Sequence, residues 1–181
     1  MHLPALQPSI APLDALLIAW REQFGADFEA YRNHCHRVAH YCAAYANCTP
    51  DNEKLVVACA FHDSGIWLDR NFDYLPCSMR RAREWLEHHG HHDWVEEVCS
   101  IIGEHHKIRR FPGPAGWMTE AFRLADRADV SHGLLAHGLP REFIRQVQAA
   151  FPNVGLHRIL LRLGWQRLRT HPLNPLPMFR W

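Results

Sequence analysis

The chain has 181 residues, of which 48% are hydrophobic and 22% are charged, and its 20 basic and 19 acidic side chains leave a formal net charge of +1. These values argue against intrinsic disorder, which requires low hydrophobicity and high net charge, and against DNA binding through bulk positive charge. The length fits one domain with a sizeable core.

Three further features of the sequence concern the setting of the protein. The longest apolar run, residues 55–61, is too short to span a bilayer. The first residues lack the basic and apolar regions of a signal peptide, and the six cysteines include no CxxC pair. We therefore expect a cytoplasmic protein with free thiols and no membrane partner.

The apolar residues recur at the helical period along nearly the whole chain, and alternating strand patterns are absent. In chain order, this spacing predicts helices over residues 14–24, 28–45, 53–63, 78–88, 93–107, 119–136, 141–151 and 154–169. The proline- and glycine-rich residues 111–116 predict a loop. The sequence therefore predicts an all-α, single-domain bundle over residues 13–170, with a proline-punctuated arm at each end, residues 1–12 and residues 171–181.

Capping signals set several of these boundaries. Thr49 followed by Pro50 predicts the start of the third helix, because a hydroxyl caps well and proline suits the first helical position. Ser64-Gly65 predicts the end of that helix. Ser78 and Thr119 are the expected caps of the fourth and sixth helices.

A histidine and an aspartate, His62-Asp63, end the apolar third helix. An unpaired buried charge is costly, and a divalent metal would satisfy both side chains, since imidazole nitrogen and carboxylate oxygen suit mid-row transition metals. His34 lies on the apolar stripe of its own helix and should point inward. His36 and His40 form an i,i+4 pair on a different face and should point outward or to a flank.

Further ligand candidates occur later in the chain. Asp126 lies one turn after Phe122 on a face that should be buried, and Asp129, one turn further on, is its competitor. His105 and His106 end an apolar helical run, so we expect at least one of them to face inward.

These residues, in this order, resemble the HD superfamily of metal-dependent phosphohydrolases. The resemblance covers approximately residues 28–130. A lone His-Asp dipeptide would be weak evidence for this family, whereas the ordered set of motifs in its helical context is specific. The matching elements are His34-Cys35-His36-Arg37-Val38, Ala60-Phe61-His62-Asp63-Ser64-Gly65, Ile102-Gly103-Glu104-His105-His106 and Leu124-Ala125-Asp126-Arg127.

The resemblance implies a helical bundle with a central metal site whose ligands are His34, His62, Asp63 and Asp126. It implies hydrolysis of a phosphoester or phosphoanhydride by metal-activated water, which Asp63 would also orient or deprotonate. The metal would be Mn, Fe, Co, Ni or Zn, with Mg as a further option. We expect one ion per chain, because Ser78 stands in the region where two-metal members carry an additional histidine.

The expected substrate is a small phosphorylated metabolite, with a nucleotide as the favoured choice. The remaining candidate residues flank the matching elements: His105 and Lys107 for catalysis, and Arg37, His106, Arg80, Arg81 and Arg109 for substrate binding. Two alternatives stay open, a di-iron oxygenase on the same scaffold and a non-catalytic ligand-binding protein. The C-terminal arm is expected either to fold back on the body or to dock on a second subunit in a homodimer.

Overall fold

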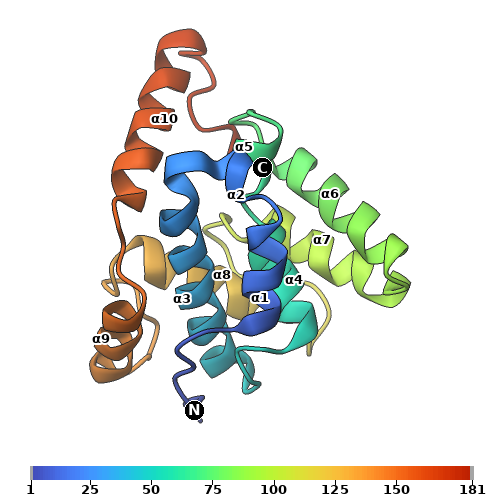
Figure 1. The fold of residues 1–181 in the computed structure, drawn as a ribbon, viewed down its shortest axis with the longest axis vertical. Helices are drawn as coiled ribbons and strands as arrows, with labels where there is room; N and C mark the ends of the chain where they lie inside the picture. The colour runs from blue at the N-terminus through green and yellow to red at the C-terminus, as the bar shows by residue number, and fades with distance from the viewer. Residues whose placement is uncertain (1, 180–181) are drawn as a thin grey trace.

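The computed structural model describes residues 2–179, and all regular secondary structure in that part of the chain is helical (Figure 1). The all-α prediction is therefore confirmed. The elements are α1 (Ala11–Ile18), α2 (Arg21–Phe24), η1 (Gly25–Asp27), α3 (Phe28–Ala46), α4 (Glu53–Phe61), α5 (Gly65–Leu68), α6 (Leu75–His88), η2 (His92–Trp94), α7 (Val95–Glu104), α8 (Thr119–Val130), α9 (Arg141–Ala150), α10 (Leu156–Thr170) and η3 (Pro177–Phe179).

Helix α3 lies at the centre of the bundle, in contact with α1, α4, α8, α9 and α10 (Figure 1). Every residue from Asn33 to Ala44 is buried, so α3 has no solvent-facing side over this stretch. The expectation that His36 and His40 point outward was therefore wrong. The His36 ring stacks on Phe151 with ring centroids 4.5 Å apart, and the His40 Nδ1 donates to the His36 carbonyl oxygen at 2.7 Å. The face of α3 that carries His36 and His40 is therefore covered by segments that are remote in the sequence.

The end of α4 differs from the prediction in a way that shapes the site. The helix ends at Phe61, and the chain turns before re-entering a helix at Gly65. A Cβ on Gly65 would lie 2.8 Å from the Tyr74 carbonyl oxygen, so only glycine permits this close approach. The Gly65 N–H donates to the Ser78 hydroxyl at 3.0 Å. Ser78 is thus an interior residue of α6 that secures the turn, and the prediction that it caps the helix was wrong.

Other helix boundaries also differ from the predicted ones. The first predicted helix is divided into α1 and α2, and α1 begins inside the segment expected as the N-terminal arm. Asn52 caps α4, because its side-chain oxygen accepts from the Leu55 N–H at 3.2 Å, whereas Thr49 was expected to do so. Helix α8 ends at Val130, where His132 and Gly133 adopt positive φ angles of 53° and 82°. Left-handed backbone ends the helix earlier than the apolar pattern predicted.

The last part of the chain returns to the body of the protein. Helix α10 runs along one side, and the segment after it leads back toward α5 (Figure 1). Met178 is buried in a cluster with Ile66 and Tyr74, so this segment folds back on the body, one of the two expected arrangements. No helix in residues 2–179 combines the length and the hydropathy needed to cross a bilayer.

Candidate metal centre

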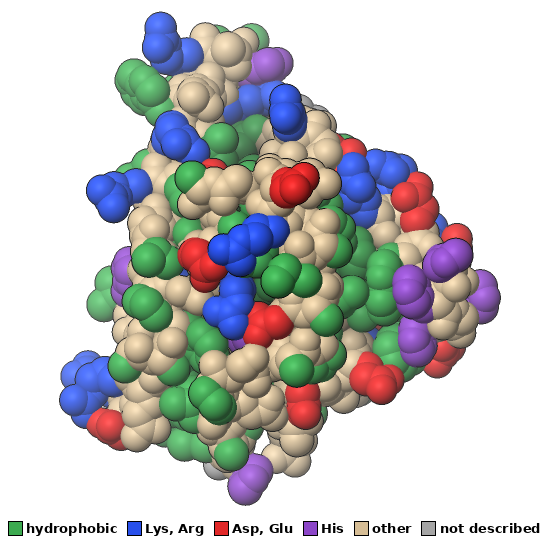
Figure 2. Space-filling view, in the orientation of Figure 1, with side chains coloured by type: hydrophobic (Ala, Val, Ile, Leu, Met, Phe, Trp, Pro, Cys, Tyr) green, Lys and Arg blue, Asp and Glu red, His purple; other side chains and the backbone are tan. Residues whose placement is uncertain are grey.

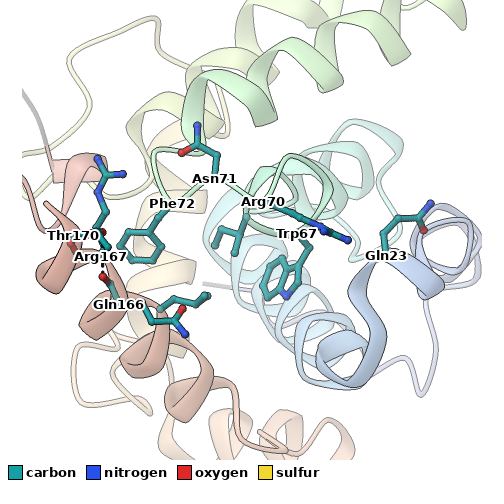
Figure 3. A pocket seen from close by; sticks show the side chains of 10 residues that line it. Gln23, Trp67, Arg70, Asn71, Phe72, Gln166, Arg167 and Thr170 are labelled. Carbon is teal, nitrogen blue, oxygen red and sulfur yellow. Dashed lines mark hydrogen bonds between the residues drawn. The ribbon is translucent and has the colours of Figure 1, made fainter.

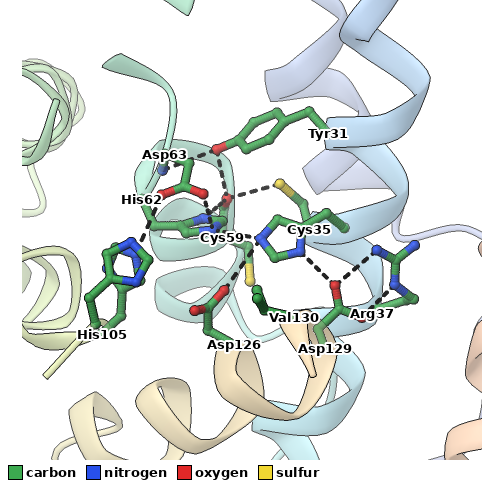
Figure 4. Close-up of polar contacts among 12 residues, drawn as sticks. Tyr31, Cys35, Arg37, Cys59, His62, Asp63, His105, Asp126, Asp129 and Val130 are labelled. Atoms are coloured by element: carbon green, nitrogen blue, oxygen red, sulfur yellow. Dashed lines mark hydrogen bonds and ion pairs between the residues drawn. The ribbon is translucent and has the colours of Figure 1, made fainter. Parts of the chain in front are cut away.

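Four helices bring imidazoles and carboxylates to one buried point (Figure 4). His34 comes from α3, His62 and Asp63 follow the end of α4, His105 follows the end of α7, and Asp126 comes from α8. Each of these side chains is at most 7% exposed. Residues that are up to 92 positions apart in the sequence therefore share one interior site.

The first pair of ligand candidates, His34 and His62, face each other through their Nε2 atoms at 3.0 Å. The His34 Nδ1 donates to Asp129 Oδ2 at 2.7 Å, and the His62 Nδ1 donates to the Cys59 carbonyl oxygen at 2.8 Å. A neutral imidazole with its proton on Nδ1 carries a lone pair on Nε2. With both rings neutral, two lone pairs would point at each other, and either a proton on His34 Nε2 or a metal ion beside the two rings would relieve the repulsion.

A second pair, Asp63 and His105, repeats this arrangement. The His105 Nδ1 donates to the Ile102 carbonyl oxygen at 2.8 Å, and its Nε2 lies 3.4 Å from Asp63 Oδ1, within ion-pair distance when the ring is protonated. Within the described part of the chain, neither of these two buried atoms has a hydrogen-bond partner. Buried polar atoms without partners are costly, and a cation would satisfy both. The donor set of imidazole nitrogens and carboxylate oxygens therefore fits a divalent metal.

The candidate ligands form two overlapping groups. The ligand atoms of His34, His62 and Asp63 lie within 4.8 Å of one another, and so do those of Asp63, His105 and His106. Asp63 belongs to both groups. Asp126 Oδ1 lies 3.4 Å from His34 Nε2, on the same side as the first group.

Burial and mutual charge set the protonation of these groups. Burial lowers the pKa of His62 to about 3, so this ring is neutral and ready to coordinate. Burial also lowers the pKa of His34, but the hydrogen bond to Asp129 and the nearby carboxylates outweigh it and raise that pKa. Burial raises the pKa of Asp126 to about 6, against the lowering effect of His105 and His34. Metal binding would therefore displace protons from the centre.

Asp129, the predicted competitor of Asp126, lies behind His34. Its carboxylate accepts from Arg37 Nε at 2.5 Å and from a second Arg37 nitrogen at 2.9 Å, besides the His34 bond. Arg37 is 2% exposed and also donates to the Phe151 carbonyl oxygen at 2.9 Å. The structure thus places Arg37 in the support of His34, away from the space where a substrate would lie. One aspartate thus lies beside the ligand candidates and the other behind His34, and the three-residue spacing of Asp126 and Asp129 is the sequence signal for these two roles.

A pocket of 160 Å³, termed the metal pocket, opens on the centre. Its polar walls are His34, Asp63, Tyr74, His106 and Asp126. The His106 Nε2 lies 2.5 Å from the Tyr74 hydroxyl. The remaining walls are apolar: Ile66, Phe72, Val130, Leu156, Leu160, Leu176 and Met178.

The other predicted residues lie elsewhere. Arg80 and Arg81 pair with Asp69, at 2.9 and 2.6 Å, on the outer side of α6. Lys107 and Arg109 lie in the loop after α7, where Arg109 is exposed. None of these four lines the metal pocket, so the structure brings together only the histidine and aspartate candidates.

Two tyrosines support the site, and neither was predicted to hold a metal-ligand candidate or its neighbour in place. The Tyr31 hydroxyl donates to the Ala60 carbonyl oxygen at 3.0 Å and accepts from the Asp63 N–H at 3.3 Å, which holds the turn after α4 (Figure 4). Its position one turn before His34, on the same stripe, is the signal that could have identified it. Tyr74, the other, lies in the region where an additional histidine was expected.

A separate polar pocket of 440 Å³ lies between α10 and the α5–α6 connection (Figure 3). Trp67, Arg70, Gln166 and Arg167 are among its walls. It touches the metal pocket only through Ile66 and Phe72, which line both spaces, and none of the metal-ligand candidates lines it.

Comparison with known proteins agrees with this geometry. A model of the HD domain family matches residues 31–134, which is more than half of the chain and includes every metal-ligand candidate. Curated proteins and solved structures include no match to this chain. HD domains are typical of metal-dependent phosphohydrolases and bind divalent metals. The ordered histidines and aspartates and the family match together show that this chain belongs to the HD domain family.

Proposed function

We propose that the protein is a metal-dependent phosphohydrolase that cleaves a phosphoester or phosphoanhydride bond of a nucleotide or another small phosphorylated metabolite. The observation that supports this most directly is that Asp63 Oδ1 and His105 Nε2, two buried atoms 3.4 Å apart beside a pocket, form no hydrogen bond among the described residues. His34, His62, Asp63 and Asp126 would hold the ion.

A divalent ion bound there would lower the pKa of a water molecule and neutralise charge on a phosphoryl oxygen. Asp63 lines the metal pocket, and we assign to it the orientation and deprotonation of the attacking water. Burial lowers the pKa of His105, but Asp63 and Asp126 outweigh it and raise that pKa, so we assign His105 to proton delivery to the leaving oxygen. Lys107, which follows His106, remains a proposed cationic contact for the phosphate.

We propose one ion per chain, of Mn, Fe, Co, Ni or Zn, with Mg as a further option. The second ligand group would need His106, whose Nε2 is already hydrogen-bonded to Tyr74. Burial raises the pKa of the Tyr74 hydroxyl well above its usual range, so it stays protonated and donates to His106.

The sharing of Asp63 between two ligand groups favours one alternative, a di-iron oxygenase. Iron close to two per chain and an oxygen-dependent change in the optical spectrum would support it. Iron or another metal close to one per chain would support the phosphohydrolase. Protein that is purified empty of metal, and whose melting temperature does not respond to added metal, would support a non-catalytic role.

The decisive variant is Asp63→Ala, with Asp93→Ala as its matched control, since Asp93 is exposed at the tip of the α6–α7 hairpin. Phosphate release would be measured from p-nitrophenyl phosphate and from a nucleotide panel with added Mn, Co, Ni or Mg. We expect Asp63→Ala to lose about 10²–10⁴-fold in rate, the range for removal of a general base, and Asp93→Ala to match wild type. Equal rates in wild type and Asp63→Ala would refute the proposal.

We propose a cytoplasmic location. All six cysteines are free, which supports the proposed cytoplasmic location. Whether the protein forms a homodimer is a question for size-exclusion chromatography with light scattering.

A further inference from the structure

The metal pocket continues into a larger space along α10. This α10 groove has a volume of 610 Å³, and three side chains, Val130, Leu160 and Leu176, line both it and the metal pocket. The groove therefore begins where the metal pocket ends. Its other principal walls are Leu161, Gly164, Trp165 and Leu168.

The groove is apolar but open to solvent. Leu161 is 74% exposed and Trp165 is 62% exposed, on successive turns of α10. In Figure 2, hydrophobic side chains occur between arginines along this side of the molecule. Contiguous apolar surface of this kind marks a binding site in a folded protein. Continuity with the metal pocket points to a ligand that also reaches the metal.

The charge of the walls limits what that ligand can be. Among the described residues that line the metal pocket or the α10 groove, there is no lysine or arginine. A nucleoside di- or triphosphate would bring several negative charges into these two spaces, where only the ion and histidines such as His106 and His157 could balance them. Arg127 lines a third space, of 540 Å³, which shares His106, Asp126 and Val130 with the metal pocket, but it lines neither the metal pocket nor the α10 groove. A single phosphate on an apolar chain matches both the charge and the walls.

Resting on the proposed function, we infer that the substrate is the phosphate monoester of an apolar, chain-like alcohol, with its phosphate at the metal centre and its chain in the α10 groove. In the reaction, the oxygen of water bonds to phosphorus and the bond between phosphorus and the alcohol oxygen breaks. The alcohol leaves with a proton, and the other product is inorganic phosphate.

The first measurement is the chain-length dependence of hydrolysis by the metal-loaded full chain. Substrates are ethyl, butyl, hexyl and octyl phosphate, with adenosine monophosphate as the polar comparison. Complete burial of one methylene is worth about a fourfold gain, so kcat/KM should rise roughly two- to fourfold per methylene in the partly open groove. The octyl ester should also be a better substrate than the nucleotide.

Gly164 provides the groove-blocking variant. A Cβ at this position would meet nothing within 4 Å, so Gly164→Leu places a side chain in the groove without a backbone clash and with a better helix former. Ala149→Leu adds an equally large side chain at an exposed position of α9 and serves as the control. Gly164→Leu should abolish the gain per methylene, and Ala149→Leu should retain it. Trp165→Ala, which removes one wall, should reduce the gain and provides a second variant.

A binding measurement separates this inference from the proposed function. Calorimetry with ethyl-, butyl- and octylphosphonate, which are not hydrolysed, should show the same gain per methylene and the same loss in Gly164→Leu. If no phosphoester is cleaved but phosphonate binding follows chain length, the groove assignment stands and the hydrolase proposal fails.

Three results would overturn the groove assignment and leave the hydrolase proposal intact. The first is Asp63-dependent hydrolysis with no dependence on chain length, and the second is a preference for adenosine monophosphate over octyl phosphate. The third is a wild-type dimer that Gly164→Leu converts to a monomer in light scattering, because a second copy of the chain would then occupy the groove.

Discussion

The ion pair behind His34 gives the sharpest quantitative prediction, for the substitution Asp129→Asn. Asp129 accepts three hydrogen bonds, two from Arg37 and one from His34, and both Asp129 and Arg37 are 2% exposed. Asparagine keeps the size but leaves the buried guanidinium without a counter-charge. Breaking a buried pair in this way costs about 3–5 kcal/mol of unfolding free energy. For a chain of this length, that loss lowers Tm by about 6–20 °C.

Asp129→Asn should also weaken metal binding. The His34 Nδ1 loses its anionic acceptor, and loss of such a supporting bond typically reduces metal affinity about 10–100-fold. Stability is measured by urea unfolding of the metal-free protein, and affinity by competition with a chromophoric chelator. Asp14→Asn is the control, because it also removes an arginine-bonded aspartate but one that bonds Arg32 and His36 and none of the ligand candidates.

A double variant separates the two effects. Arg37→Met with Asp129→Leu removes both buried charges, so it should recover most of the stability that Asp129→Asn loses. His34 still lacks its acceptor in the double variant, so metal affinity should remain low. A loss below about 1 kcal/mol in Asp129→Asn, or undiminished metal affinity in that variant, would refute the reasoning, since neither agrees with a buried charge pair that orients His34.

Three further predictions concern other parts of the molecule. Gly65→Ala should destabilise the protein by about 1–3 kcal/mol in urea unfolding, because the new Cβ would lie 2.8 Å from the Tyr74 carbonyl oxygen, and an unchanged midpoint would contradict this. Burial raises the pKa of Asp14, but the Arg32 bond and other hydrogen bonds outweigh it and lower the pKa from 3.8 to about 2. Because the folded pKa is the lower one, this contribution is present above pH 4 and is lost as the pH falls toward 2. The stabilities of wild type and Asp14→Asn should therefore differ at pH 7 and converge near pH 2, and a constant difference would be the contrary result. Removal of metal by a chelator should lower Tm, since an ion at 100 times its Kd adds about 2.7 kcal/mol, and Asp63→Ala should lack most of this shift. An equal chelator response in both proteins would count against the assigned ligand.

The helical period of the apolar residues was sufficient to predict the all-α fold, because that period is a local property of the chain. The boundaries were less predictable where tertiary contacts decide them. Ser78 has the chemistry of a helix cap, yet its hydroxyl serves the Gly65 turn instead. The division of the first helix and the early end of α8 likewise depend on neighbours that no local pattern contains.

The ligand candidates were predicted from their places on apolar helical faces and, as a set, from the resemblance to the HD family. What the sequence could not show is which tertiary contacts His36 and Arg37 make. His36 was expected outside because α3 was treated as a helix with two faces, whereas Phe151 covers the second face. Arg37 was expected at the phosphate because it flanks the ligand candidates in the sequence, but Asp129, 92 residues later, binds the guanidinium.

The contacts of Arg37 reach beyond the metal centre. Its third nitrogen donates to the carbonyl oxygens of Phe151 and Pro152, in the junction between α9 and α10. Arg37 and Asp129 thus connect that junction to His34, the imidazole proposed to bind the ion. A random-mutagenesis screen for proteins that release their metal too easily should therefore recover substitutions in residues 151–152 as well as in the ligands, although the junction itself touches no ion.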